Sequence, residues 1–197
     1  MAFNLERQLL FYGQYHHDPV NVGIHITCVP PILLTGLMLA TNAPDINVPS
    51  LISIPNLPVN LGTIGALGYS VGFILLEPVA GALISPVIMG STIYGSYLTS
   101  TYGMTANWWL IGTQVICWVA QFIGHGAFEG RAPALLDNLV QALFLAPLFV
   151  WLEILFFFGY RPELKARLDK SVEQELTKLK QSERQRKVNG SANGSAK

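Results

Sequence analysis

Charged side chains are almost absent from the first 160 residues of this chain. Only two of the 12 Lys and Arg and seven of the 12 Asp and Glu lie in residues 1–160 of the 197. The whole chain is 12% charged and 51% hydrophobic, whereas a soluble domain carries roughly 25% charged residues. So few charges cannot cover the surface of a soluble domain. This composition excludes a nucleic-acid-binding protein, an ordinary cytosolic enzyme and a disordered chain, and it predicts a membrane domain over residues 1–160.

Five apolar runs divide this membrane domain: residues 24–40, 61–76, 79–98, 108–123 and 139–158. A membrane-spanning helix needs about 20 apolar residues, so the first, second and fourth runs predict short or tilted helices. We expect Pro30 and Pro31 to interrupt the first run and Pro86 to kink the third. The predicted fold class is all-α, a polytopic transmembrane helical bundle with short, partly kinked helices.

The remaining segments predict short connections and a solvated tail. Residues 4–15 predict an amphipathic helix that Asp18-Pro19 ends, and residues 41–60 predict an exposed loop. Glu77-Pro78 predicts a tight hairpin between two apolar runs. Residues 161–197 predict a charged, partly disordered tail that is helical over residues 163–187. Because Lys and Arg crowd behind the last apolar run, the tail is expected in the cytosol.

The four histidines lie close to the predicted membrane boundaries. His16, His17 and His25 fall within ten residues, and His125 directly follows the fourth apolar run. Ionisable groups at such depth are costly and suggest function, and imidazole suits Fe, Zn and Cu. Glu129 and Asp137 follow His125 and could orient its ring as outer-shell carboxylates. The alternative is capping or hydrogen-bonded interfacial histidines, because the spacing matches no established metal-binding motif.

Topology restricts any site that the histidines share. If His25 and His125 belong to one site, an even number of membrane crossings must separate them, and the first four apolar runs supply an even number. A fifth crossing would place the tail opposite the site, whereas a re-entrant fifth run at Pro147 would place both in the cytosol.

Two separated blocks of sequence resemble the Mpo1-like family of fungal and bacterial membrane proteins. They are Tyr-His-His-Asp-Pro-Val-Asn at residues 15–21 with His25, and Gly-His-Gly-Ala-Phe-Glu-Gly-Arg-Ala-Pro-Ala-Leu-Leu-Asp-Asn at residues 124–138, followed by Leu-Val-Gln-Ala-Leu-Phe-Leu-Ala-Pro. The resemblance covers roughly residues 5–165.

This resemblance implies an enzyme and a metal cofactor. Yeast-type members are Fe(II)-dependent dioxygenases of the endoplasmic reticulum membrane. With O2, they shorten 2-hydroxy fatty acids such as 2-hydroxypalmitate by one carbon and release CO2, in fatty-acid α-oxidation during phytosphingosine degradation. The resemblance makes His16, His17, His25 and His125 the candidate Fe(2+) ligands. The expected partners are the fatty acid and membrane lipid, and no nucleic acid.

Three further polar residues are candidates for substrate binding. Arg131 could pair with the substrate carboxylate, or snorkel and bridge to a neighbouring acid. Asn21 and Asn138 could donate hydrogen bonds near the site, or cap helices.

Two other classes of protein remain open from the sequence. One is a non-enzymatic polytopic membrane scaffold or lipid-binding protein in which the histidines are structural. The other is a b-type haem protein, although histidines at the ends of apolar runs argue against axial haem ligation.

Overall fold

The structure is a computed structural model that describes residues 4–47, 58–130 and 141–194. All regular elements within these residues are helical, which confirms the predicted all-α class. In chain order the elements are α1 Leu5–Tyr15, α2 Pro19–Ala40, α3 Leu61–Leu76, α4 Pro78–Tyr102, α5 Met104–Ile123, the π-helical turn η1 Gly124–Glu129, the π-helical turn η3 Gln141–Leu145, α6 Ala146–Phe157 and α7 Pro162–Gly194.

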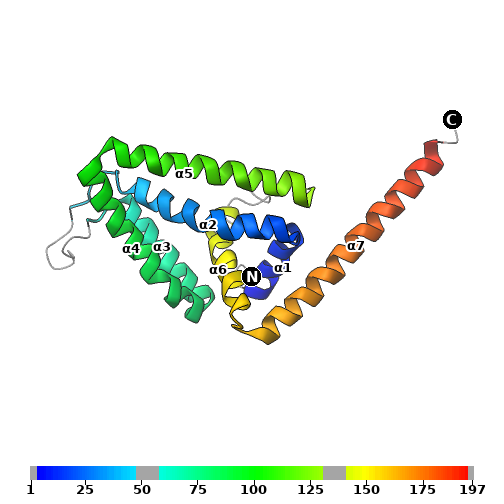
Figure 1. Ribbon diagram of the computed structural model, residues 1–197. Helices are drawn as coiled ribbons and strands as arrows, with labels where there is room; N and C mark the ends of the chain where they lie inside the picture. The colour runs from blue at the N-terminus through cyan, green and yellow to red at the C-terminus, as the bar shows by residue number, and fades with distance from the viewer. Residues whose placement is uncertain (1–3, 48–57, 131–140, 195–197) are drawn as a thin grey trace.

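Two pairs of helices and a central helix form the bundle. α2 and α5 lie side by side, the α3–α4 hairpin packs against α2, and α6 packs on α2 between this hairpin and α1 (Figure 1). Leu148, Phe149, Val150 and Leu152 of α6 are completely buried. A helix that is apolar on all sides is expected in such a central position.

Three helices are long and apolar enough to cross a membrane: α2, α4, and α5 together with η1. α3 is equally apolar but shorter. Large apolar side chains on these helices face outward, among them Leu75, Trp109 and Ile116, each at least 70% exposed. Only a lipid environment accommodates so much outward apolar surface, so the chain is a membrane protein.

The expected interruption of the first apolar run is wrong. α2 continues through Pro30 and Pro31 without a break. Thr35 Oγ1 donates to the Pro31 carbonyl at 2.6 Å, and Gln114 Nε2 of α5 donates to the Ile32 carbonyl at 2.6 Å. Neither bond reaches the carbonyls of Ile26 and Thr27, which are the ones that Pro30 and Pro31 deprive of an intrahelical N–H donor. Membrane helices tolerate proline where neighbouring helices pack against them, as α4 and α5 pack against α2 here.

A buried carboxylate links the α3–α4 hairpin to the corner between α6 and α7. Glu77 ends α3 and precedes Pro78, the first residue of α4, as the predicted hairpin requires. Its carboxylate accepts a hydrogen bond from Tyr160 Oη at 2.7 Å and forms an ion pair with Arg161. These contacts hold α7 at its bend of 116° relative to the preceding helix.

The charged helix α7 starts beside α1 and then extends away from the bundle as a long arm (Figure 1). Leu164 and Leu168 are buried, and Arg167 Nε lies 3.2 Å from Glu6 Oε1 of α1. α7 continues to Gly194, so it includes part of the segment expected to be disordered. Extension of an existing helix needs no new nucleation, which allows residues of low helix propensity to follow.

Candidate metal centre and adjoining cavity

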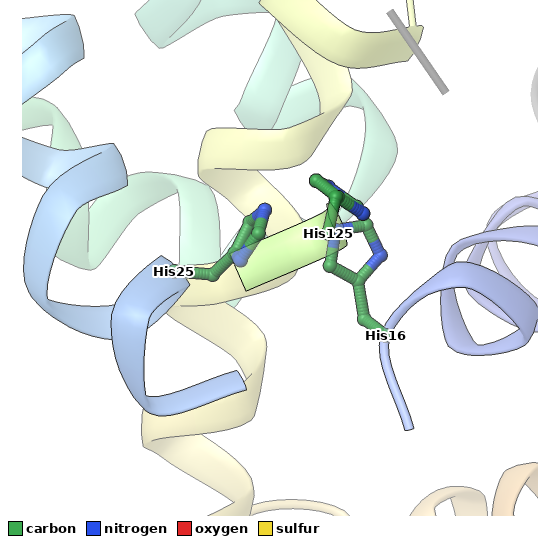
Figure 2. A group of neighbouring side chains, drawn as sticks. All are labelled: His16, His25 and His125. Carbon is green, nitrogen blue, oxygen red and sulfur yellow. The ribbon is translucent and has the colours of Figure 1, made fainter. Parts of the chain in front are cut away.

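Three histidines from three separate segments converge in the interior. His16 is the C-terminal cap of α1, His25 lies in the second turn of α2, and His125 lies in η1. Figure 2 shows their rings directed toward one another. The ring centroids are 4.3 Å apart for His16 and His25, and 4.9 Å apart for each of these rings and His125. One potential ligand atom from each ring lies within 4.8 Å of the other two.

Backbone contacts fix the orientation of two of these rings. His16 Nδ1 lies 2.9 Å from the Tyr12 carbonyl oxygen, and His25 Nδ1 lies 2.9 Å from the Asn21 carbonyl oxygen. Because a carbonyl oxygen only accepts, each Nδ1 carries the proton and each Nε2 keeps a lone pair. Metal-binding histidines typically donate their second ring nitrogen in this way.

The third ring and the local electrostatics also fit a cation. His125 Nδ1 is buried and has no hydrogen-bond partner within the described parts of the chain. Burial and the neighbouring His25 hold the pKa of His16 well below its ordinary value, so this ring is neutral at neutral pH. Neutral imidazole is the form that binds metal, so the three side chains fit a divalent cation.

His17 lies outside this cluster and contacts Glu129 instead. Its Nδ1 is 2.7 Å from Glu129 Oε2, and the Glu129 side chain is completely buried. Glu129 Oε1 accepts hydrogen bonds from the backbone N–H groups of His17 and Asp18 at 2.8 and 2.9 Å and from Asn21 Nδ2 at 3.1 Å. The carboxylate therefore fastens the α1–α2 corner, which carries His16, to the turn that carries His125.

A turn of π-helix places His125 and Glu129 on one segment. η1 continues directly from α5 and ends at Gly130, whose φ of 63° lies in the left-handed region that glycine favours. Such turns are frequent at functional sites. Here the wider turn directs His125 toward the other two histidines and Glu129 toward the α1–α2 corner.

The contact between η1 and α2 requires a glycine. A Cβ atom added at Gly124 would lie 2.4 Å from Asn21 Oδ1, whereas a Cβ at Gly126 in the same turn would meet nothing within 4 Å. We expect Gly124→Ala to lower the stability by about 1–3 kcal/mol, because the added methyl group pushes η1 away from α2. Thermal unfolding of the purified protein in detergent measures this effect, with Gly126→Ala as the matched control. Equal melting temperatures for the two variants would contradict the close approach.

A cavity of about 310 Å³ opens from the histidine cluster. It follows α2 from His25 to Leu37, a length of about 18 Å at 1.5 Å per residue. The wall is mostly apolar and includes Val29, Leu33 and Phe122, together with all three clustered histidines. This shape suits a long apolar ligand whose polar end lies at the histidines.

The structure places the other predicted site residues differently. Asn21 is completely buried and donates to Glu129, and it is not among the residues that line the cavity. Arg131, Asp137 and Asn138 lie outside the described residues. Sequence reasoning missed Tyr12 and Gln121, which both line the cavity. The available signal for Gln121 was an amide four residues before His125, in an apolar run whose other polar side chains are Thr113 and Gln114.

The spacing of the rings argues against the haem alternative. Each pair of the three histidines is in direct edge-to-face contact. No gap remains between any two rings for the plane of a porphyrin.

Comparison with known proteins identifies the family of this chain. The family described as "2-hydroxy-palmitic acid dioxygenase Mpo1-like" matches residues 2–158. The chain is 35% identical over 170 residues to the "2-hydroxy-palmitic acid dioxygenase MPO1" of Saccharomyces cerevisiae, which covers 86% of this chain and 90% of the yeast protein. No solved structure matches the chain. The chain therefore belongs to the Mpo1-like family of 2-hydroxy-palmitic acid dioxygenases.

Proposed function

We propose that this protein is an Fe(II)-dependent dioxygenase that shortens long-chain 2-hydroxy fatty acids by one carbon. The observation that carries the proposal is the convergence of His16, His25 and His125 at one end of an apolar cavity. Membership of the Mpo1-like family supports the substrate class, because the yeast relative is named for its action on 2-hydroxy-palmitic acid.

The donor set is compatible with iron. Three neutral nitrogen ligands come from His16, His25 and His125. Backbone carbonyls fix the orientation of the His16 and His25 rings. Three protein ligands leave positions open for small molecules, as in the sites of non-haem Fe(II) oxygenases. Iron held there would supply a Lewis acid for the two neighbouring oxygens of a 2-hydroxy acid and the electron-transfer chemistry that O2 requires.

The proposed reaction balances without another reductant: R–CH(OH)–COOH + O2 gives R–COOH + CO2 + H2O. The C1–C2 bond breaks, C1 leaves as CO2, and C2 becomes the carboxyl carbon of the shortened acid. The substrate supplies all the electrons that reduce O2. The chain therefore needs no nicotinamide or flavin to complete this turnover.

The protein's own residues bind and orient the substrate in this scheme. The apolar wall along α2 takes the acyl chain, and burial of each CH2 contributes about 0.8 kcal/mol. The Tyr12 and Asn21 carbonyls keep the His16 and His25 rings in one tautomer. Glu129, bound to His17, Asp18 and Asn21, holds the first histidine segment against η1. We assign His17 and Asn21 to this positioning and not to metal or substrate.

The arrangement of the helices also supports a particular order in which the chain crosses the membrane. His25 and His125 lie at the same end of the bundle, so we infer that α3 crosses together with the longer α2, α4 and α5. α7 contacts α1, whose end carries His16, and so it lies on the same side as the site. α6 then enters and leaves from that side. Because the basic α7 belongs in the cytosol, the site opens toward the cytosolic side of the endoplasmic reticulum membrane, where Fe(II) is available.

An assay of the purified protein with 2-hydroxypalmitate tests the proposed function. We expect the odd-chain acid to form in the presence of Fe(II) and O2, to disappear after chelation and to return when Fe(II) is added. A folded protein that yields no odd-chain acid under any metal condition would contradict the enzyme and favour a scaffold with structural histidines.

A further inference from the structure

Gln121 carries a buried hydrogen-bond donor that is not paired within residues 4–47, 58–130 and 141–194. It lies on α5, one helical turn before His125, and only 7% of its surface is exposed. Its Nε2 is inaccessible to solvent and has no hydrogen-bond partner among the residues that the structure describes. Because nearly all buried polar groups in proteins are paired, an unpaired amide that lines a cavity indicates a missing ligand group.

A second glutamine on the same helix shows what a structural amide looks like in this cavity. Gln114 Nε2 donates to the Ile32 carbonyl at 2.6 Å and lies 2.8 Å from Thr35 Oγ1. Its Oε1 accepts from Trp118 Nε1 at 3.1 Å. Both ends of the Gln114 amide are therefore paired, Nε2 with α2 and Oε1 within α5, whereas the Gln121 donor remains free for a ligand.

Gln121 lies at the polar end of the cavity, near the histidine cluster. Residues four apart on a helix lie on the same face, so Gln121 lines the cavity beside His125. Beyond the histidines, the α2 wall presents Val29, Leu33 and Leu37. Among the described residues of the cavity wall there is no Lys or Arg, so, apart from the proposed Fe(II), a bound anion would rely on neutral donors.

We propose that Gln121 Nε2 donates a hydrogen bond to the carboxylate of the 2-hydroxy fatty acid, and thereby selects the free acid and sets its head at the histidine cluster. This inference rests on the proposed function, since that function supplies the substrate class. The acyl chain then extends along the apolar wall of α2. Hydrogen bonds to ionised oxygens are roughly twice as strong as those to neutral ones, so the amide favours the acid over its ester.

Tyr12 offers a second unpartnered donor in the same wall, but its variants would be less informative. Its Oη has no hydrogen-bond partner in the structure, and its ring stacks on His16 with a centroid separation of 4.0 Å. Substitution of Tyr12 would therefore disturb a proposed ligand, whereas Gln121 makes no comparable ring contact among the described residues.

The test measures equilibrium binding of 2-hydroxypalmitate and of its methyl ester to the full-length protein in detergent, without O2, both with and without Fe(II). Gln121→Met removes the amide with little change of volume. We expect the dissociation constant for the acid to rise about 10- to 100-fold and that for the ester to rise much less. Gln114→Met serves as the matched control and keeps the preference for the acid.

Thermal unfolding separates this role from a structural one. Gln121→Met removes no hydrogen bond to the described part of the chain, so we expect its melting temperature to equal or exceed that of the wild type. Gln114→Met loses three polar contacts and should melt at a lower temperature. Equal weakening of acid and ester, or a loss of stability in Gln121→Met as large as that in Gln114→Met, would overturn the assignment.

The same experiment distinguishes this inference from the proposed function. If the wild type binds the acid in preference to the ester but forms no odd-chain product, the dioxygenase proposal fails and the role of Gln121 is supported. If the product forms and Gln121→Met retains the preference for the acid, the role of Gln121 is overturned and the dioxygenase stands.

Discussion

Replacement of His25 or His125 by alanine is expected to abolish the turnover of 2-hydroxy fatty acids while the protein remains inserted in the membrane. Each variant removes one of three nitrogen ligands that lie together. Loss of a residue that only orients a metal ligand typically lowers affinity or activity about 10- to 100-fold, so loss of a ligand should exceed about 100-fold. Turnover is measured as odd-chain acid formed from 2-hydroxypalmitate with Fe(II).

The fourth histidine provides the matched control. His17 contacts Glu129 and not the other three histidines. We expect His17→Ala to lower turnover only partly, because the backbone N–H groups of His17 and Asp18 still bind Glu129. Wild-type turnover in His125→Ala would show that the ligand assignment is wrong. Complete loss in a folded His17→Ala variant would show that the control residue is itself essential.

Glu129→Ala is expected to cause a large combined loss of stability and activity. It leaves two backbone N–H groups and the Asn21 amide without their buried acceptor. Each such unpaired group costs about 1–3 kcal/mol, so the variant should lose about 3 kcal/mol or more. Turnover should fall about 10- to 100-fold, because His16 is no longer held against His125.

The conservative variant separates the shape of the side chain from its charge. Glu129→Gln keeps one carbonyl oxygen that can accept hydrogen bonds from the α1–α2 corner. Its melting temperature and Fe(II) affinity should therefore lie between those of Glu129→Ala and those of the wild type. Thermal unfolding and Fe(II) affinity are measured for both variants. A Glu129→Ala protein with wild-type melting temperature and wild-type Fe(II) affinity would contradict the role of this carboxylate.

Much of the fold follows from hydrophobicity alone. The apolar runs become α2 to α6, and the boundaries of α3 agree with the predicted run because Asn60 caps its start and Glu77 precedes a proline at its end. Pro30 and Pro31 misled the prediction because their effect depends on the packing of α4 and α5 against α2. Such tertiary compensation is not readable from one segment.

The candidate site was only partly predictable, for a similar reason. The sequence placed four histidines near one membrane boundary, but it could not distinguish the role of His16 from that of its neighbour His17. The two differ because α1 ends at His16, and the side chain of the next residue, His17, contacts Glu129 and not the histidine cluster. The role of Gln121 depends on the state of its hydrogen bonds, which only the packed structure reveals.

The most direct test of the three-histidine iron site is the Fe(II) content of the purified protein after anaerobic reconstitution. We expect the wild type to bind about one iron per chain, His17→Ala to retain most of it, and the alanine variants of His16, His25 and His125 each to fall to background. Full iron binding by a folded protein that lacks any one of these three histidines would contradict the site.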